Sequence, residues 1–252
     1  FNMKIVKCLW RNKQMVGEME QNEDLLPKQS NQICVTGCPR SSTKYMANLL
    51  QQITGEITFH EPYYYNTDFK AISDWMLTGM FIKDNNLLNQ FSNKIHIVRN
   101  PIDCISSLHT IGIKPAHKNT PTDVCFNDFD IYNEDDHLTI KAMKVWTKWN
   151  KMASDVCDIT MRIEDLDKLH EPTIHTLLDI CEIPKEKYKQ YTDIIENCYN
   201  NNKTLNTRRV NNKTWIENRK EVSMSSWDYL RSISEVEYNN VKSLAIKYGY
   251  NE

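Results

Sequence analysis

Cationic and hydroxyl side chains gather in one short stretch of this chain, between an apolar run and a segment of helical periodicity. Residues 33–35 are an apolar run typical of a buried strand, and apolar residues recur at helical spacing from Tyr45 to Ile53. The N-terminus of a helix presents unpaired N–H groups and about half a positive charge. Arg40 adds a permanent cation, and residues 41–43 add hydroxyl donors. The stretch therefore predicts a binding site for a phosphate or sulfate group.

An ordinary strand–turn–helix corner is the alternative interpretation of this stretch, with Ser42 or Thr43 capping the helix. The nucleotide-triphosphate pattern G-x-x-x-x-G-K-[ST] is only half met, because Ser42, Thr43 and Lys44 stand where glycine, lysine and a hydroxyl residue are required. A magnesium-dependent nucleotide triphosphatase is therefore disfavoured.

A second strand–turn–helix pattern begins at residue 95. Residues 95–98 suit a strand, Asn100 suits a helix cap, and Pro101 suits the first helical position. Arg99 stands at the end of the predicted strand and Ser107 two turns into the predicted helix, so both are expected to face one anion. The alternatives are a surface ion pair for Arg99 and a solvated hydroxyl for Ser107.

The two stretches together resemble the sulfotransferases that use 3′-phosphoadenosine 5′-phosphosulfate (PAPS). Residues 39–44, Pro-Arg-Ser-Ser-Thr-Lys, resemble the loop P-[KR]-S-G-T-T, which binds the 5′-phosphosulfate in that family. Residues 99–107 fill every fixed position of the motif R-[ND]-P-x-D-x-x-x-S, which binds the 3′-phosphate. Residues 164–166 match the family's E-D-L at a strand end. The motifs follow one another in the family's order.

The chain also departs from the family pattern. Ser42 replaces a glycine, which changes the path of the loop if that position needs a positive φ. Tyr45 stands where cytosolic members have a tryptophan that stacks on adenine, and Ile163 stands where many members have tyrosine.

The resemblance implies an enzyme that transfers a sulfuryl group in line from PAPS to a hydroxyl or amine and releases 3′-phosphoadenosine 5′-phosphate (PAP), without a metal. It implies that Glu61 is the general base, and that Arg40 and the N–H groups of residues 41–44 stabilise the departing phosphate. His60 is the second candidate for the base and His109 the third. A small molecule, a carbohydrate or a tyrosyl side chain is expected as the acceptor.

The donor-binding residues are expected to come from the two motifs and from a late basic loop over residues 203–213. A solvated basic turn is the alternative for that loop. The expected residues are Gly37, Cys38, Pro39, Arg40, Ser41, Ser42, Thr43, Lys44, Tyr45, Arg99, Ser107, Arg208 and Arg209. Two other functions stay open: a phosphotransferase that uses a nucleotide triphosphate, and a non-catalytic nucleotide-binding module on the same fold.

The elements that must position these residues alternate between strand and helix, which predicts an α/β fold with a central parallel sheet and helices on both faces. The resemblance narrows this expectation to the P-loop, nucleotide-kinase-like sulfotransferase fold. Residues 1–31 are expected to form an N-terminal appendage, with a hairpin as its candidate structure, and residues 32–252 are expected to form the sulfotransferase domain. Strands are predicted over residues 33–36, 57–60, 95–98 and 159–163. Helices are predicted over residues 138–156, 172–181, 185–200 and 234–248, with two more within 68–91 and an irregular lid over 112–137.

Composition sets outer limits on partners and location. With 252 residues and a net charge of −2, no global field attracts nucleic acid or a membrane. The eight cysteines contain no C-x-x-C pair, which favours reduced thiols and no metal site. If Met3 is the native start, the chain is expected in the cytoplasm. A lumenal catalytic domain trimmed from a membrane anchor is the alternative, and the oligomeric state is open.

Overall fold

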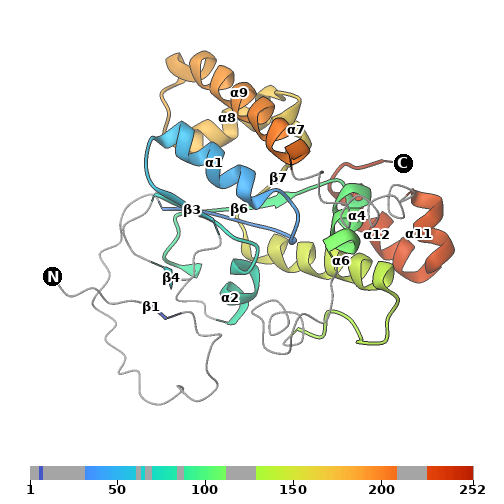
Figure 1. Cartoon of the computed structure of the whole chain (residues 1–252). Coiled ribbons are helices and arrows are strands. Elements are labelled where there is room, and N and C mark those ends of the chain that lie inside the picture. The colour runs from blue at the N-terminus through green and yellow to red at the C-terminus, as the bar shows by residue number, and fades with distance from the viewer. Residues whose placement is uncertain are drawn as a thin grey trace, which may run out of the picture.

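The computed structural model of the chain describes residues 6–7, 32–60, 64–65, 70–83, 88–111, 129–208 and 226–251 (Figure 1). Five strands within these ranges form one all-parallel sheet, in the order β3 (Thr58–His60), β5 (Ala71–Ser73), β2 (Ile33–Thr36), β6 (Asn93–Val98) and β7 (Ile159–Arg162). The predicted α/β architecture with a parallel sheet and flanking helices is confirmed.

The central strand β2 is buried on both faces, as its unbroken apolar run predicts. Ile33 and Val35 point into one hydrophobic cluster and Cys34 into another, and all three side chains are fully buried. Val35 pairs with Ser73 of β5 on one side and with Ile95 of β6 on the other.

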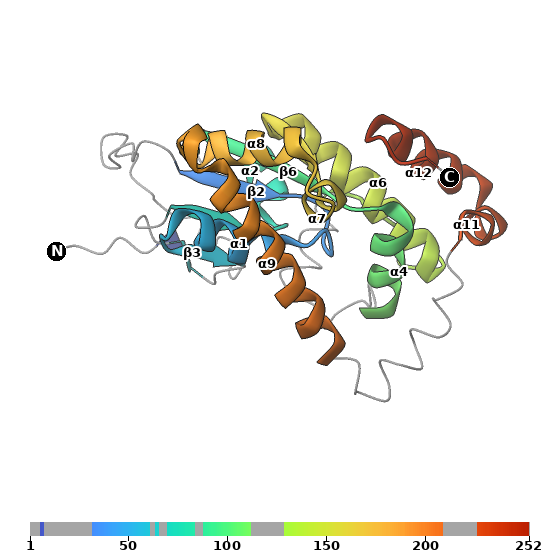
Figure 2. The same cartoon turned by 90° about the horizontal axis from the view of Figure 1, so that it is seen from above.

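Helices cover both faces of the sheet (Figure 1). One face carries α1 (Thr43–Thr54), α8 (Glu171–Ile180) and α9 (Tyr188–Arg208). The short helix α7 (Ile163–Asp167) precedes α8, and the turn η2 (Lys185–Lys187) precedes α9. The opposite face carries α2 (Leu77–Lys83), α4 (Pro101–Ile111), α6 (Leu138–Val156) and α12 (Glu235–Lys247). Seen from above, α11 (Trp227–Ile233) and α12 lie beside α6 and α4 at one end of the molecule (Figure 2).

Helix α6 provides the largest side chains of the second face. Its predicted bounds, 138–156, agree with those observed. Trp146 and Trp149 are fully buried, and Trp149 packs against Trp75 with ring centroids 5.4 Å apart. Burying each of these side chains contributes on the order of 3 kcal/mol to stability. Trp75 is therefore part of the core.

The prediction of two helices over residues 68–91 is wrong in its first part. Residues Ala71–Ser73 form strand β5 between β3 and β2, and a helix starts only at Leu77. The strand consists of three fully buried residues. So short an apolar run carries neither a period of two nor a helical period, and only its neighbours in the sheet define it.

The prediction of a loop over residues 203–213 is wrong for its first half, because α9 continues to Arg208. The polar side chains there suggested a loop, but the helix is anchored by its buried N-terminal half, including Ile195 and Cys198. Residues 209–213 lie outside the described residues. Strand β7 also ends one residue earlier than predicted, because Ile163 starts α7.

The first 31 residues are described only at β1 (Val6–Lys7), within the predicted appendage. This strand pairs antiparallel with β4 (Tyr64–Tyr65). The predicted hairpin and most of the predicted lid over 112–137 lie outside the described residues. In the part of the chain that the structure describes, no helix combines the length and apolar character needed to cross a membrane.

Candidate anion-binding site

The loops that follow β2 and β6 lie at the carboxyl ends of two adjacent parallel strands. The chain leaves β2 through α1 toward β3, on one face of the sheet. It leaves β6 through α4 and α6 toward β7, on the opposite face. Two adjacent strands whose connections diverge in this way mark the point where the strand order of the sheet reverses, and open α/β sheets generally bind ligands beyond the carboxyl ends of the strands at such a point.

Gly37 brings the two loops close together. A Cβ atom at this position would lie 2.2 Å from the carbonyl oxygen of Ile97 in β6. Any side chain would therefore push the first loop away from the second strand. The glycine is required here by close approach of the backbone.

The sequence motifs meet directly at this corner of the sheet. The Arg40 Nε–H group donates a hydrogen bond to Ser107 Oγ at 3.0 Å, and Arg99 Nη1 donates to the Arg40 carbonyl at 3.3 Å. Arg40 is exposed, whereas Arg99 and Ser107 are half-buried. Two cationic side chains and a hydroxyl group from separate segments thus surround one exposed corner, an arrangement suited to binding anions.

Two residues of the first loop adopt the left-handed conformation without being glycine. Arg40 has φ 73° and Ser42 has φ 71° and ψ 27°. This backbone costs about 1 kcal/mol or more per residue relative to right-handed conformations. Ser42 stands where the similar sulfotransferase motif has glycine, and it has a positive φ, which glycine adopts without strain.

The capping interpretation of Ser42 is confirmed for its position in the chain but not for its side chain. Ser42 is the N-cap residue of α1, but its side chain makes no capping hydrogen bond. The first N–H groups of a helix have no partner within the helix. At α1 they lie beside Arg40 and the exposed Lys44, where an anion would bind both the N–H groups and the cations.

The inner side of the first loop is packed into the core. Cys38, Ser41 and Thr43 are buried, and Cys38 lies with its sulfur 4.0 Å from that of Cys104 in α4. Burial raises the pKa of the Cys38 thiol well above its ordinary value. Burial opposes ionisation of Cys104 as well, but hydrogen bonding with Cys38 and the nearby charges of Arg99 and Arg40 lower the pKa of that thiol. The six cysteines within the described residues form no disulfide.

Tyr45, the expected counterpart of an adenine-stacking tryptophan, points into the core. It is 8% exposed and packs in the cluster formed by α1, α8 and α9. Burial raises the pKa of its hydroxyl group. Its ring lines no open surface in this structure.

The buried His96 is linked to the first loop through Asn150. The ring of His96 in β6 contacts Asn150 Oδ1 through Nε2 at 3.0 Å and Thr160 Oγ1 through Nδ1 at 3.2 Å. The same Asn150 oxygen accepts a hydrogen bond from the backbone N–H of Cys38 at 3.3 Å. Burial, with a smaller contribution from the charge of Lys247, lowers the pKa of His96 to about 4.

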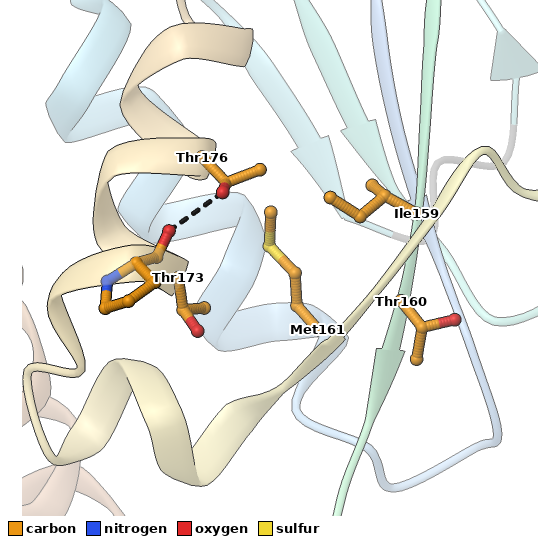
Figure 3. Close-up of a pocket in the computed structure, with 6 residues that line it drawn as sticks. Ile159, Thr160, Met161, Thr173 and Thr176 are labelled. Carbon is orange, nitrogen blue, oxygen red and sulfur yellow. Dashed lines mark hydrogen bonds between the residues drawn. The ribbon is translucent and has the colours of Figure 1, made fainter. Parts of the chain in front are cut away.

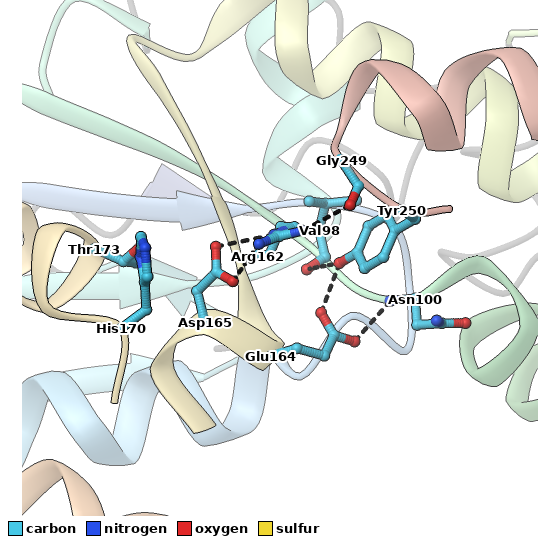
Figure 4. A network of polar contacts seen from close by, with 9 residues as sticks. All are labelled: Val98, Asn100, Arg162, Glu164, Asp165, His170, Thr173, Gly249 and Tyr250. Carbon is cyan, nitrogen blue, oxygen red and sulfur yellow. Dashed lines mark hydrogen bonds and ion pairs between the residues drawn. The ribbon is translucent and has the colours of Figure 1, made fainter. Parts of the chain in front are cut away.

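The loop after β6 is held by Glu164 and Tyr250, which the sequence did not predict as site residues (Figure 4). Glu164 of the E-D-L motif accepts a hydrogen bond from the backbone N–H of Asn100 at 2.8 Å. Its other carboxylate oxygen accepts one from the hydroxyl of Tyr250 at 2.6 Å. Asn100 in turn caps α4 by accepting from the N–H of Ile102 at 2.9 Å. Tyr250 gave no sequence signal, because its role depends on a contact across 86 residues.

The three candidate bases lie in different places. Glu61 is outside the described residues. His60 ends β3, and its Nδ1 lies 3.0 Å from the carbonyl oxygen of Ser73. His109 in α4 contacts Thr139 in α6 at 3.1 Å. Of the late arginines, Arg208 ends α9 and Arg209 lies outside the described residues.

A pocket of about 150 Å³ lies elsewhere, between the edge strand β7 and α8 (Figure 3). Ile159, Thr160 and Met161 line it from the strand, and Thr173 and Thr176 from the helix. It contains no residue of the two motifs.

The chain matches no protein-family model, and no curated protein is significantly similar to it. Functional assignment therefore rests on the geometry described above and on the motifs.

Proposed function

We propose that the protein is a PAPS-dependent sulfotransferase. The observation that carries the proposal is the meeting of both motifs: Arg40 bonds Ser107 at 3.0 Å, and Arg99 bonds the Arg40 carbonyl at 3.3 Å. PAPS presents two anionic groups, the 5′-phosphosulfate and the 3′-phosphate. The two loops offer matching cations and donors on neighbouring strand ends, and the motifs they carry resemble the family's donor-binding motifs.

The transfer would proceed in line, from the donor to an acceptor hydroxyl or amine. Negative charge develops on the oxygen that bridges sulfur and the departing phosphate, and Arg40 with the N-terminal N–H groups of α1 would stabilise it. Arg99 and Ser107 would hold the 3′-phosphate and thereby fix the direction of the donor. No step in this scheme requires a metal.

The acceptor would lie toward β3, and a base there would take its proton. β3 is separated from β2 by β5 alone, and strands lie about 4.8 Å apart, so the ends of β3 and β2 are about 10 Å apart. Glu61 directly follows β3 and is the proposed base. His60, the last residue of β3, is the second candidate, because histidine is the commonest general base.

Calorimetric titration tests the donor site first. PAP, 5′-AMP and ATP would each be titrated into the protein with EDTA and again with magnesium. We expect tight PAP binding that needs the 3′-phosphate, is unchanged by EDTA and falls at least tenfold in Arg99→Ala. Arg231→Ala, at a surface arginine of α11 that contacts Tyr238, is the control and should bind PAP normally.

Turnover with an acceptor panel tests the chemistry. Arg40→Ala should lower kcat by about 100-fold or more, as loss of one donor to a developing oxyanion does. Glu61→Gln and His60→Gln distinguish the two bases, because only the true base should lose turnover while keeping PAP affinity. Binding of ATP only with magnesium would instead favour a phosphotransferase, and PAP binding without any acceptor would favour a binding module.

A further inference from the structure

Three side chains hold the backbone of residues 98–100, which carries Arg99: Trp146 of α6, Glu164 of α7, and Tyr250 after the end of α12. The Val98 carbonyl accepts from the Tyr250 hydroxyl at 3.3 Å, and the Arg99 carbonyl accepts from Trp146 Nε1–H at 3.3 Å. The Asn100 N–H donates to Glu164 at 2.8 Å. Each peptide of this short segment is therefore tied to the body of the protein.

Glu164 is the most strongly bonded of these anchors. A carboxylate acceptor makes hydrogen bonds about twice as strong as a neutral one. Its two oxygens are divided between Asn100, at 2.8 Å, and Tyr250, at 2.6 Å (Figure 4). The Tyr250 hydroxyl shares its proton between Glu164 and the Val98 carbonyl, so one phenol links both sides of Arg99.

Tyr250 is itself held in place. It is 7% exposed, and burial together with the charge of Glu164 raises the pKa of its hydroxyl, which keeps the hydroxyl a donor. Arg162 donates to the carbonyl of the preceding Gly249 at 2.7 Å and lies 5.6 Å from the centre of the Tyr250 ring. Asp165 fixes Arg162 in turn through a 2.9 Å hydrogen bond.

We infer that Tyr250 and Glu164 are positioning residues that set the direction of Arg99 and thereby the affinity for the 3′-phosphate. This inference rests on the proposed function. The hydroxyl of Tyr250 acts through Glu164 and the backbone of residues 98–100, and it need not touch the donor. Its loss should therefore weaken the 3′-phosphate contact selectively and leave the 5′-phosphate contacts at α1 unchanged.

The test compares Tyr250→Phe with Tyr248→Phe. Each variant removes one hydroxyl from a nearly buried ring, but the Tyr248 hydroxyl donates to the Asn150 carbonyl in α6 at 3.1 Å. PAP and 5′-AMP would be titrated into both variants and the wild type. We expect Tyr250→Phe to lower the affinity for PAP about tenfold and to leave the affinity for 5′-AMP unchanged. Tyr248→Phe should keep the wild-type ratio of the two affinities.

Hydrogen exchange provides a readout that does not need PAP. The peptide containing Asn100 should exchange several-fold faster in Tyr250→Phe than in Tyr248→Phe. Equal loss of PAP and 5′-AMP affinity, or equal exchange in the two variants, would overturn the inference. If exchange changes as expected but the wild type shows no preference for PAP over 5′-AMP, the segment is positioned by Tyr250 and the proposed sulfotransferase function is what fails.

Discussion

Acid should destabilise this protein through His96. The ring is fully buried, and its pKa is lowered to about 4, against 6.5 in a free side chain. In the range between these values the unfolded state binds more protons than the folded state, so stability rises with pH there. A shift of about 2.5 units corresponds to about 3 kcal/mol. That contribution is fully present above pH 6.5 and is lost as the pH falls to about 4.

Urea unfolding at closely spaced pH values between 4 and 7.5 measures this effect. As the pH is lowered from 7.5 to 4, the free energy of unfolding should decrease in the wild type. In His96→Gln this decrease should be smaller by about 3 kcal/mol. His170→Gln is the control, because His170 is exposed and its ring contacts the hydroxyl of the neighbouring Thr173 at 2.9 Å, at the surface (Figure 4). The reasoning is refuted if His96→Gln keeps the full pH dependence, or if His170→Gln removes it.

Three further predictions concern the first loop. Gly37→Ala should destabilise the fold by about 3 kcal/mol in urea unfolding, because its Cβ would lie 2.2 Å from the Ile97 carbonyl; an unchanged midpoint would contradict this. Ser42→Gly should raise the free energy of unfolding by about 1 kcal/mol, since it relieves a φ of 71°, and a loss of stability would show that the residue contributes by other contacts. Cys38 should react with a thiol reagent only after unfolding, because burial raises its pKa; rapid labelling of the native protein, located by mass spectrometry, would argue against the buried placement.

The sequence was most informative where a pattern is repeated over many residues or has a fixed local form. The apolar stripe of α6 predicted both of its ends, because a helix of 19 residues passes through several turns of the same period. The bounds of β2 were likewise predicted, because a buried apolar run is broken at once by Gly37. Strand β5 was missed since its three residues carry no period and gain their identity from β3 and β2.

The residues of the two motifs could be predicted from the sequence, but the side chains that hold them in place could not. The motifs named Arg40, Arg99 and Ser107, and these residues do meet. Ser42 occupies the predicted N-cap position, but its side chain makes no capping hydrogen bond, because a positive φ departs from the usual cap geometry. Tyr250 could not be found from the sequence, because a single tyrosine hydroxyl carries no local signal of a partner 86 residues away.

The place of Tyr250 in the chain has a consequence for biosynthesis. Glu164 and Val98 precede it by 86 and 152 residues, so a ribosome makes both motifs well before it makes the residue that links them. At roughly 5–20 residues per second, the interval after Glu164 lasts several seconds. During that time β2, β6 and β7 can pair, but the segment around Arg99 lacks one of its anchors. A nascent chain would therefore form its sheet before the segment around Arg99 has all its anchors, and on the proposed function a chain that ends before Tyr250 should bind an anionic ligand there more weakly than the full chain.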